Sequence, residues 1–251
     1  MVKDPISVKY DMKIASESSG NEPLLFSEII ESPGQRAVTN ILTRHRLCEA
    51  FKVEPGELID ILSWAMENPS DTVLVEADSA PVLENKMEQT DISVLPIPRH
   101  YREDGGRYQS SSIIVAQYGK QRNTSFHRQL LKGPDRTTVR LVPRHLRTMA
   151  DQAFENNEDV PIVVVNGPDP LVLLAAAMSF NEPIDELRVA SALHERLYGA
   201  KLGLVEMPNG VQVPAESEYA MEARITTKLD DEGPYVDITG TVDDIRQEPV
   251  I

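Results

Sequence analysis

The sequence predicts an α/β fold in two parts: a mixed α/β unit over residues 1–100 and a β-rich unit over residues 101–251. Three observations support this prediction. Apolar residues at helical spacing follow Glu54. Proline and glycine clusters at residues 96–98 and 103–106 separate the two parts. Beyond these clusters, short apolar runs typical of strands dominate the chain.

In the first part, the clearest elements are one helix and one strand. Glu54-Pro-Gly-Glu57 predicts a helix start, because proline fits the first turn. Apolar residues continue the helical spacing: Leu58, Ile61, Leu62, Ala65 and Met66. Asn68-Pro-Ser ends this helix, and residues 72–76 form a short strand.

In the second part, strands are predicted at residues 112–116, 137–141, 161–165, 218–227 and 235–241. The run at 161–165 is wholly apolar, which is typical of a buried strand. Asp169-Pro170 then starts a buried helix over residues 171–180, because aspartate caps free amides. Another helix is expected from about residue 185 to residue 198.

Composition narrows the function classes. The chain has 251 residues, 41% of them apolar, and a formal net charge of −15, which disfavours a nucleic-acid binder. No apolar run is long enough to span a membrane, and no secretory signal is visible. A single cysteine, Cys48, excludes an internal disulfide and is expected to be a buried apolar residue. These features predict a cytoplasmic protein.

The charge is unevenly spread. Between Tyr118 and Arg147, Asp135 is the only acid among eight basic residues: Lys120, Arg122, Arg128, Lys132, Arg136, Arg140, Arg144 and Arg147. Such a stretch indicates either an anionic small ligand or a basic segment that pairs with acids elsewhere. Glycine-rich loops of the Rossmann or P-loop type are absent.

Two short segments carry candidate chemistry. In residues 122–128, Asn123 offers an amide oxygen suited to Mg²⁺ or Mn²⁺, and Arg128 can clamp a carboxylate through two hydrogen bonds. In Glu232-Gly-Pro-Tyr-Val-Asp237, a Gly-Pro turn can bring two acids to one site. Ordinary turn and surface roles remain alternatives for both segments.

Several motifs occur in the order found in one family. The chain resembles the UbiD family of reversible decarboxylases, which use prenylated flavin mononucleotide (FMN). The resemblance rests on Leu95-Pro-Ile-Pro-Arg-His-Tyr, Asp104-Gly-Gly-Arg-Tyr108, Arg122-Asn123 to Arg128, Pro143-Arg-His145, residues 161–170, Val213-Pro-Ala-Glu-Ser-Glu218 and residues 232–237.

The resemblance implies a flavin-binding split β-barrel with flanking helices over residues 101–251. It implies decarboxylation of an unsaturated or aromatic acid, such as anhydromevalonate phosphate or a polyprenyl hydroxybenzoate. The implied cofactors are prenylated FMN, Mn²⁺ or Mg²⁺, and K⁺. A flavin prenyltransferase would supply the cofactor. The alternative is a non-catalytic or split-enzyme fragment that binds flavin or a partner without turnover.

The resemblance also implies roles for individual residues. The metal ligands would be Asn123, His145 and Glu218. The catalytic triad would be Arg128, Glu232 and Asp237, with Asp237 as the proton donor. The flavin contacts would be Ser125, Phe126, His127, Arg128, Leu141, Val142, Pro143, Leu146 and Arg147.

The chain departs from the family pattern in two ways. Thr124-Ser125 replaces the usual Val-Gly, and His127 replaces the usual tyrosine, which predicts a flavin pocket of altered polarity. Family members normally continue with a further domain beyond the position of Ile251. A second subunit that supplies this domain is therefore an expected partner.

Overall fold

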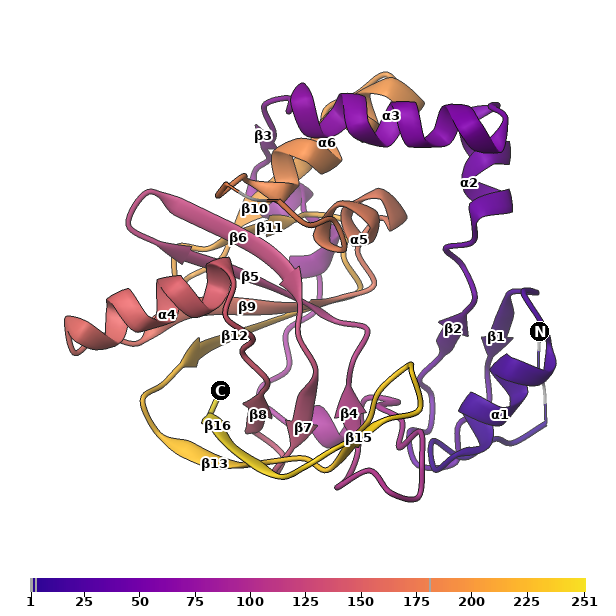
Figure 1. Ribbon diagram of the computed structural model, residues 1–251, viewed down its shortest axis with the longest axis vertical. Coiled ribbons are helices and arrows are strands. Elements are labelled where there is room, and N and C mark those ends of the chain that lie inside the picture. The colour runs from indigo at the N-terminus through magenta and orange to yellow at the C-terminus, as the bar shows by residue number, and fades with distance from the viewer. Residues whose placement is uncertain (1, 3, 181) are drawn as a thin grey trace.

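The computed structural model describes residues 2, 4–180 and 182–251 (Figure 1). At its centre lies an antiparallel sheet in the strand order β12–β9–β5–β6. The four strands are β5 (Ile113–Tyr118), β6 (Gln121–Phe126), β9 (Val160–Asn166) and β12 (Tyr219–Ile225). Three of them lie where strands are predicted. β6 was missed because one of its faces is polar.

Helices cover both faces of this sheet (Figure 1), and the central strand β9 shows why. Val163 and Val165 face the core formed with α5 (Pro170–Ala176) and α6 (Glu186–Tyr198). Ile162 and Val164 face the core formed with α4 (His145–Glu155). A strand buried on both faces needs continuous apolar residues, which confirms the prediction from residues 161–165.

One helix prediction needs correction, and one helix was missed. The helix predicted to continue to residue 180 ends at Ala176, where tighter bonds such as Met178 N–H to the Ala175 carbonyl replace the α-helical pattern. α4 was not predicted, although its buried residues have helical spacing: Leu146, Met149, Ala150 and Ala153.

Small sheets form the lower end of the molecule in Figure 1. One contains β4 (Tyr108–Gln109), β7 (Gln129–Leu131) and β8 (Thr137–Val139). The others are the pairs β13 (Leu229–Glu232) with β16 (Arg246–Pro249), and β14 (Tyr235–Val236) with β15 (Val242–Asp243). The single strand predicted over residues 235–241 is therefore wrong. Gly240, at φ +79°, reverses the chain between β14 and β15.

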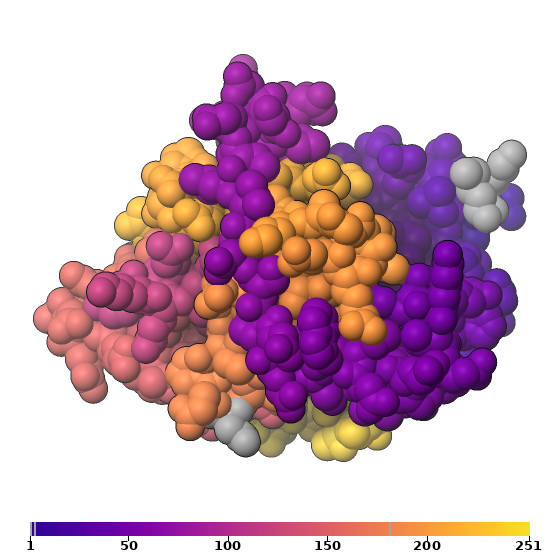
Figure 2. Space-filling model, turned by 90° about the horizontal axis from the view of Figure 1, so that it is seen from above, coloured from indigo at the N-terminus to yellow at the C-terminus, as the bar shows by residue number. Residues whose placement is uncertain are grey.

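The N-terminal part contains α1 (Asp11–Ser18), β1 (Leu24–Phe26), β2 (Ala37–Thr39), α2 (Arg44–Phe51), α3 (Pro55–Glu67), β3 (Val73–Leu74) and 3₁₀ turns at Ala77–Ser79, Pro81–Leu83 and Ile92–Val94. Figure 2 shows α3 beside α6. β3 pairs with β10 (Gly203–Glu206), which also pairs with β11 (Gln212–Pro214). Contacts thus cross the predicted boundary at residue 100, and a separate N-terminal domain stays a prediction.

None of the helices within the described residues is long and apolar enough to cross a membrane.

We expect Ile114→Ala to lower the free energy of unfolding by about 2–5 kcal/mol, because it leaves a cavity in the core under the sheet. Ile114 is fully buried, whereas Ile238 is 95% exposed and provides the matched control. Urea unfolding checks this prediction. Equal midpoints for Ile114→Ala and Ile238→Ala would contradict the assigned core.

Candidate functional site

Arg128 and Glu232 form a buried ion pair. Arg128 lies between β6 and β7, and Glu232 is the last residue of β13. Arg128 Nε lies 2.9 Å from Glu232 Oε1, and Nη2 lies 3.0 Å from Oε2. The Glu232 side chain is completely buried. Two parallel hydrogen bonds fix the orientation of the guanidinium as well as its position.

The remaining surroundings of Arg128 are an acid and an aromatic ring. Nη1 donates to Asp243 Oδ2 at 2.7 Å, and this bond lowers the pKa of Asp243. The Tyr235 ring lies 4.5 Å from the guanidinium carbon. Three of the five guanidinium N–H groups are therefore used by described side chains. The other two N–H groups have no hydrogen-bond partner among the described residues.

The structure brings two of the three predicted catalytic residues into contact. Asp237 follows β14, and its Oδ1 accepts from the Ile238 amide at 2.6 Å. Within the described residues, Asp237 makes no hydrogen bond to Arg128 or Glu232. It lies half-buried at the mouth of the β14–β15 turn.

Asp104 holds the Gly-Pro segment in place. Its buried carboxylate accepts from the Val236 amide at 2.9 Å through Oδ1, and from the Tyr101 amide at 2.8 Å through Oδ2. A Cβ atom on Gly105 would come within 2.3 Å of the Gly233 carbonyl oxygen. The Asp104-Gly105 pair thus explains why this motif accompanies residues 232–237: it positions them.

A second buried acid, Glu186, was missed by sequence reasoning. Its Oε1 lies 2.9 Å from Asn123 Nδ2, and its Oε2 accepts from the Thr124 amide at 2.7 Å. β6 is an edge strand, so the Thr124 amide has no strand partner on its outer side. Burial raises the pKa of Glu186 to about 7. The only feature of the sequence that pointed to Glu186 was the predicted start of a helix near Asp185.

Polar side chains continue along one face of β6. Ser125 Oγ lies 2.8 Å from Asn123 Oδ1 and 3.0 Å from His127 Nε2. His127 Nδ1 lies 3.0 Å from the Arg140 carbonyl oxygen, and burial lowers the pKa of His127. The tautomer of His127 decides which ring nitrogen donates in these two contacts.

The Asn123 side chain links Ser125 to Glu186. Its amide nitrogen donates to Glu186 Oε1, and its amide oxygen accepts from Ser125 Oγ. The Asn123 oxygen, a ligand type that suits Mg²⁺ or Mn²⁺, therefore points toward Ser125 and away from Glu186.

The other predicted metal ligands are less clearly placed. His145 is the half-buried first residue of α4. Glu218 is exposed, and a Cβ atom on Gly167 would come within 2.5 Å of its Cγ. Among the described residues, no group of three His, Cys, Asp or Glu side chains could hold a metal ion. The set Asn123, His145 and Glu218 stays a prediction.

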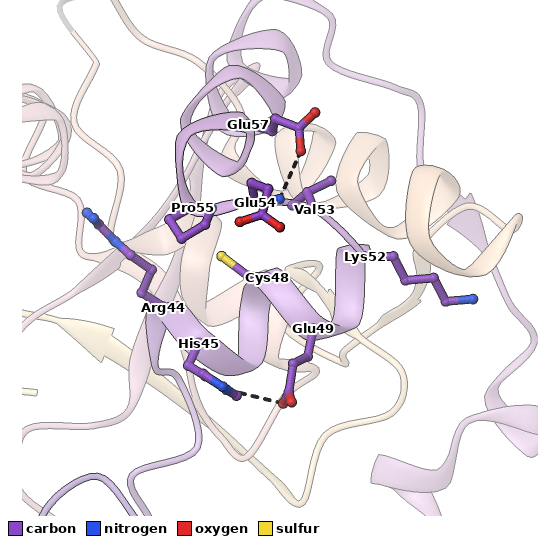
Figure 3. A pocket seen from close by; sticks show the side chains of 9 residues that line it. All are labelled: Arg44, His45, Cys48, Glu49, Lys52, Val53, Glu54, Pro55 and Glu57. Atoms are coloured by element: carbon purple, nitrogen blue, oxygen red, sulfur yellow. Dashed lines mark hydrogen bonds and ion pairs between the residues drawn. The ribbon is translucent and has the colours of Figure 1, made fainter.

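The predicted flavin contacts fall into three groups by burial. His127, Leu141 and Leu146 are buried, while Val142, Pro143 and Arg147 are exposed. Ser125 and Phe126 are half-buried, like Arg128. A hollow of about 860 Å³ lies elsewhere, between α2 and the start of α3 (Figure 3). It is lined by Arg44, His45, Cys48, Glu49, Lys52, Val53, Glu54, Pro55 and Glu57.

Most of the basic residues between Tyr118 and Arg147 pair with acids. The pairs are Arg122–Asp185, Arg128–Glu232, Arg128–Asp243, Lys132–Asp230, Arg136–Asp135, Arg140–Glu248 and Arg147–Asp151. These pairs favour the interpretation that most of the basic stretch is a segment that pairs with acids, and not a site for an anionic ligand.

Comparison with known proteins bears directly on this site. A family model described as the UbiD 3-octaprenyl-4-hydroxybenzoate carboxy-lyase Rift-related domain matches residues 73–251. The chain belongs to the UbiD family. The suspected resemblance and the α/β fold class are confirmed.

Curated relatives and solved structures agree with this membership. The chain is 36% identical to an anhydromevalonate phosphate decarboxylase from Methanosarcina mazei, over all of this chain and 57% of the relative. It is 34% identical to another from Methanothermobacter thermautotrophicus, over 58% of that relative. It resembles an evolved dimeric form of the UbiD-class enzyme HmfF from Pelotomaculum thermopropionicum, solved with prenylated FMN, at TM-score 0.93 and 29% identity. That match covers 99% of this chain and 59% of HmfF. The chain thus spans little more than half of these proteins.

We expect Glu232→Gln to lower the free energy of unfolding by about 3 kcal/mol, because it leaves the buried Arg128 guanidinium short of a negative partner. Glu216→Gln, an exposed change nearby in the chain, is the matched control and should leave the unfolding midpoint unchanged. Urea unfolding measures both. If Glu232→Gln matches its control, Arg128 and Glu232 are not a buried pair.

Proposed function

We propose that this chain forms the flavin- and metal-binding part of a decarboxylase that acts on a small unsaturated carboxylic acid. The observation that carries the proposal is the guanidinium of Arg128, which Glu232 orients and which keeps two N–H groups available. The relatives named anhydromevalonate phosphate decarboxylases favour a substrate that also bears a phosphate. An aromatic acid, as in the description of the family model, is the alternative substrate class.

In this proposal each residue of the catalytic triad has a separate role. Arg128 binds the substrate carboxylate, and Glu232 keeps the guanidinium charged and aligned. Prenylated FMN, when bound, supplies the electron sink for loss of CO₂. The bond between the carboxyl carbon and its neighbour breaks, and Asp237 then delivers a proton to the neighbouring carbon. The half-buried position of Asp237 allows it to reach substrate and then regain a proton from water.

Residues along β6 and at the start of α4 would hold the cofactors. We propose that Asn123, His145 and Glu218 bind a divalent cation, as the family resemblance implies. An amide oxygen, an imidazole nitrogen and a carboxylate together form a ligand set that fits Mg²⁺ or Mn²⁺. Ser125 to Arg128, with Leu141 to Pro143, Leu146 and Arg147, would contact the flavin.

A second candidate function is flavin binding without turnover until a second polypeptide is added. The matched residues make up 57% of the Methanosarcina mazei relative, so turnover can depend on the remainder of that relative. Such a split enzyme would use the same residues of this chain. Co-expression with a flavin prenyltransferase and Mn²⁺, followed by visible spectroscopy and a CO₂ release assay, distinguishes the two candidates. A chain that binds no flavin would contradict both.

We expect Asp237→Asn to slow product formation about 10²–10⁴-fold, because an amide cannot deliver the proton that completes the reaction. Flavin binding should persist, since Asp237 lies outside the predicted flavin contacts. Asp60→Asn, an exposed change on α3, is the control. The assay measures turnover by the assembled enzyme, with the visible spectrum of each variant beside it. Unchanged turnover in Asp237→Asn would exclude Asp237 as the donor.

A further inference from the structure

A basic and aromatic cluster lies where α1 meets the segment before β4. The two segments are tied together by backbone bonds: the Tyr10 amide donates to the Arg99 carbonyl at 2.9 Å, and the Arg99 amide donates to the Val8 carbonyl at 3.0 Å. Four side chains form what we call the α1 cluster: Lys13, Arg99, His100 and Tyr101. In a chain of net charge −15, this is a local exception.

Lys13 is the principal cation of the α1 cluster. Its ammonium lies 4.1 Å from the centre of the Tyr101 ring. Glu17 pairs with Lys13 at 2.8 Å from the solvent side, but the Glu17 side chain is 60% exposed. Solvent therefore weakens the ion pair between Glu17 and Lys13. The Lys13 ammonium has three N–H donors, and Glu17 does not use all of them. Lys13 keeps capacity for another anion.

Two buried nitrogen atoms in the α1 cluster lack partners. Arg99 Nε and His100 Nδ1 are both shielded from water and have no hydrogen bond within the described part of the chain. Buried polar atoms without partners are destabilising and rare in folded proteins. Both atoms can carry a hydrogen and donate it to an acceptor oxygen, whereas Arg99 Nη2 already donates to the Arg102 and Asp104 carbonyls.

The α1 cluster is continuous with the proposed site. Asp104 accepts the His100 and Tyr101 amides through Oδ2 and the Val236 amide through Oδ1. Val236 lies between Tyr235, which packs against Arg128, and Asp237. Because three amides share the Asp104 carboxylate, its charge opposes an incoming anion only weakly. The α1 cluster therefore lies at the Asp237 end of the site.

We propose that the α1 cluster binds a second anionic group of the substrate, a phosphate or a carboxylate, while Arg128 binds the carboxylate that is lost. Such a substrate would be a small acid with negative groups at both ends. The role in catalysis rests on the proposed function. Binding of an anion by the α1 cluster does not, because it needs neither flavin nor turnover.

The test titrates the chain with inorganic phosphate and follows backbone amide and histidine ring signals by NMR. We expect saturable shifts at His100 and Tyr101 that sodium chloride at equal ionic strength does not reproduce. Lys13→Gln should weaken phosphate binding about tenfold, because one charge-assisted bond is lost. Lys201→Gln, an exposed change after α6, is the matched control and should bind like the original chain.

Tyr101→Phe keeps the ring beneath Lys13 and guards against a folding effect of Lys13→Gln. It should bind phosphate more weakly than the original chain while unfolding at the same urea concentration. Equal phosphate affinity in Lys13→Gln and Lys201→Gln would overturn the proposal, as would shifts confined to residues outside α1 and 99–104. Either failure would leave flavin binding and CO₂ release untouched, so it is distinguishable from failure of the proposed function.

Discussion

The buried pair of Arg128 and Glu232 is the interaction on which the rest of the site depends. The fully buried Glu232 carboxylate needs a partner of opposite charge, and two parallel hydrogen bonds leave the Arg128 guanidinium little freedom in its placement. The pair joins the end of β6 to the end of β13, two segments 104 residues apart. Asp243 and Tyr235 then complete the surroundings of the guanidinium from the β14–β15 pair. The same contacts that stabilise the lower part of the molecule therefore orient the Arg128 guanidinium.

A second constraint comes from the edge of the central sheet. Among the described residues, β6 has no strand neighbour on its outer side, and Glu186 of α6 binds there to the Thr124 amide and the Asn123 side chain. Arg122 strengthens this junction by pairing with Asp185 at the start of α6. The junction explains how a polar strand can lie beside two apolar cores.

The sequence predicted the parts of this structure whose patterns are local. The apolar run in β9, the proline-led start of α3 and the capped start of α5 all follow from short-range rules. The family resemblance placed Arg128 and Glu232 together correctly. Glu186 could not be predicted, because only the packing of α6 against the β6 edge distinguishes it from an ordinary first-turn acid. The β14–β15 turn was missed because residues 235–241 contain β-forming residues, and Gly240 decides the reversal.

The most direct test of the central pair is a double-mutant cycle of Arg128→Met and Glu232→Gln, measured by urea unfolding of the chain. A buried, mutually dependent pair predicts a coupling energy of about 2 kcal/mol, with the double variant losing less stability than the sum of the single changes. Single changes that add to within about 0.5 kcal/mol would show two independent residues and would contradict the account.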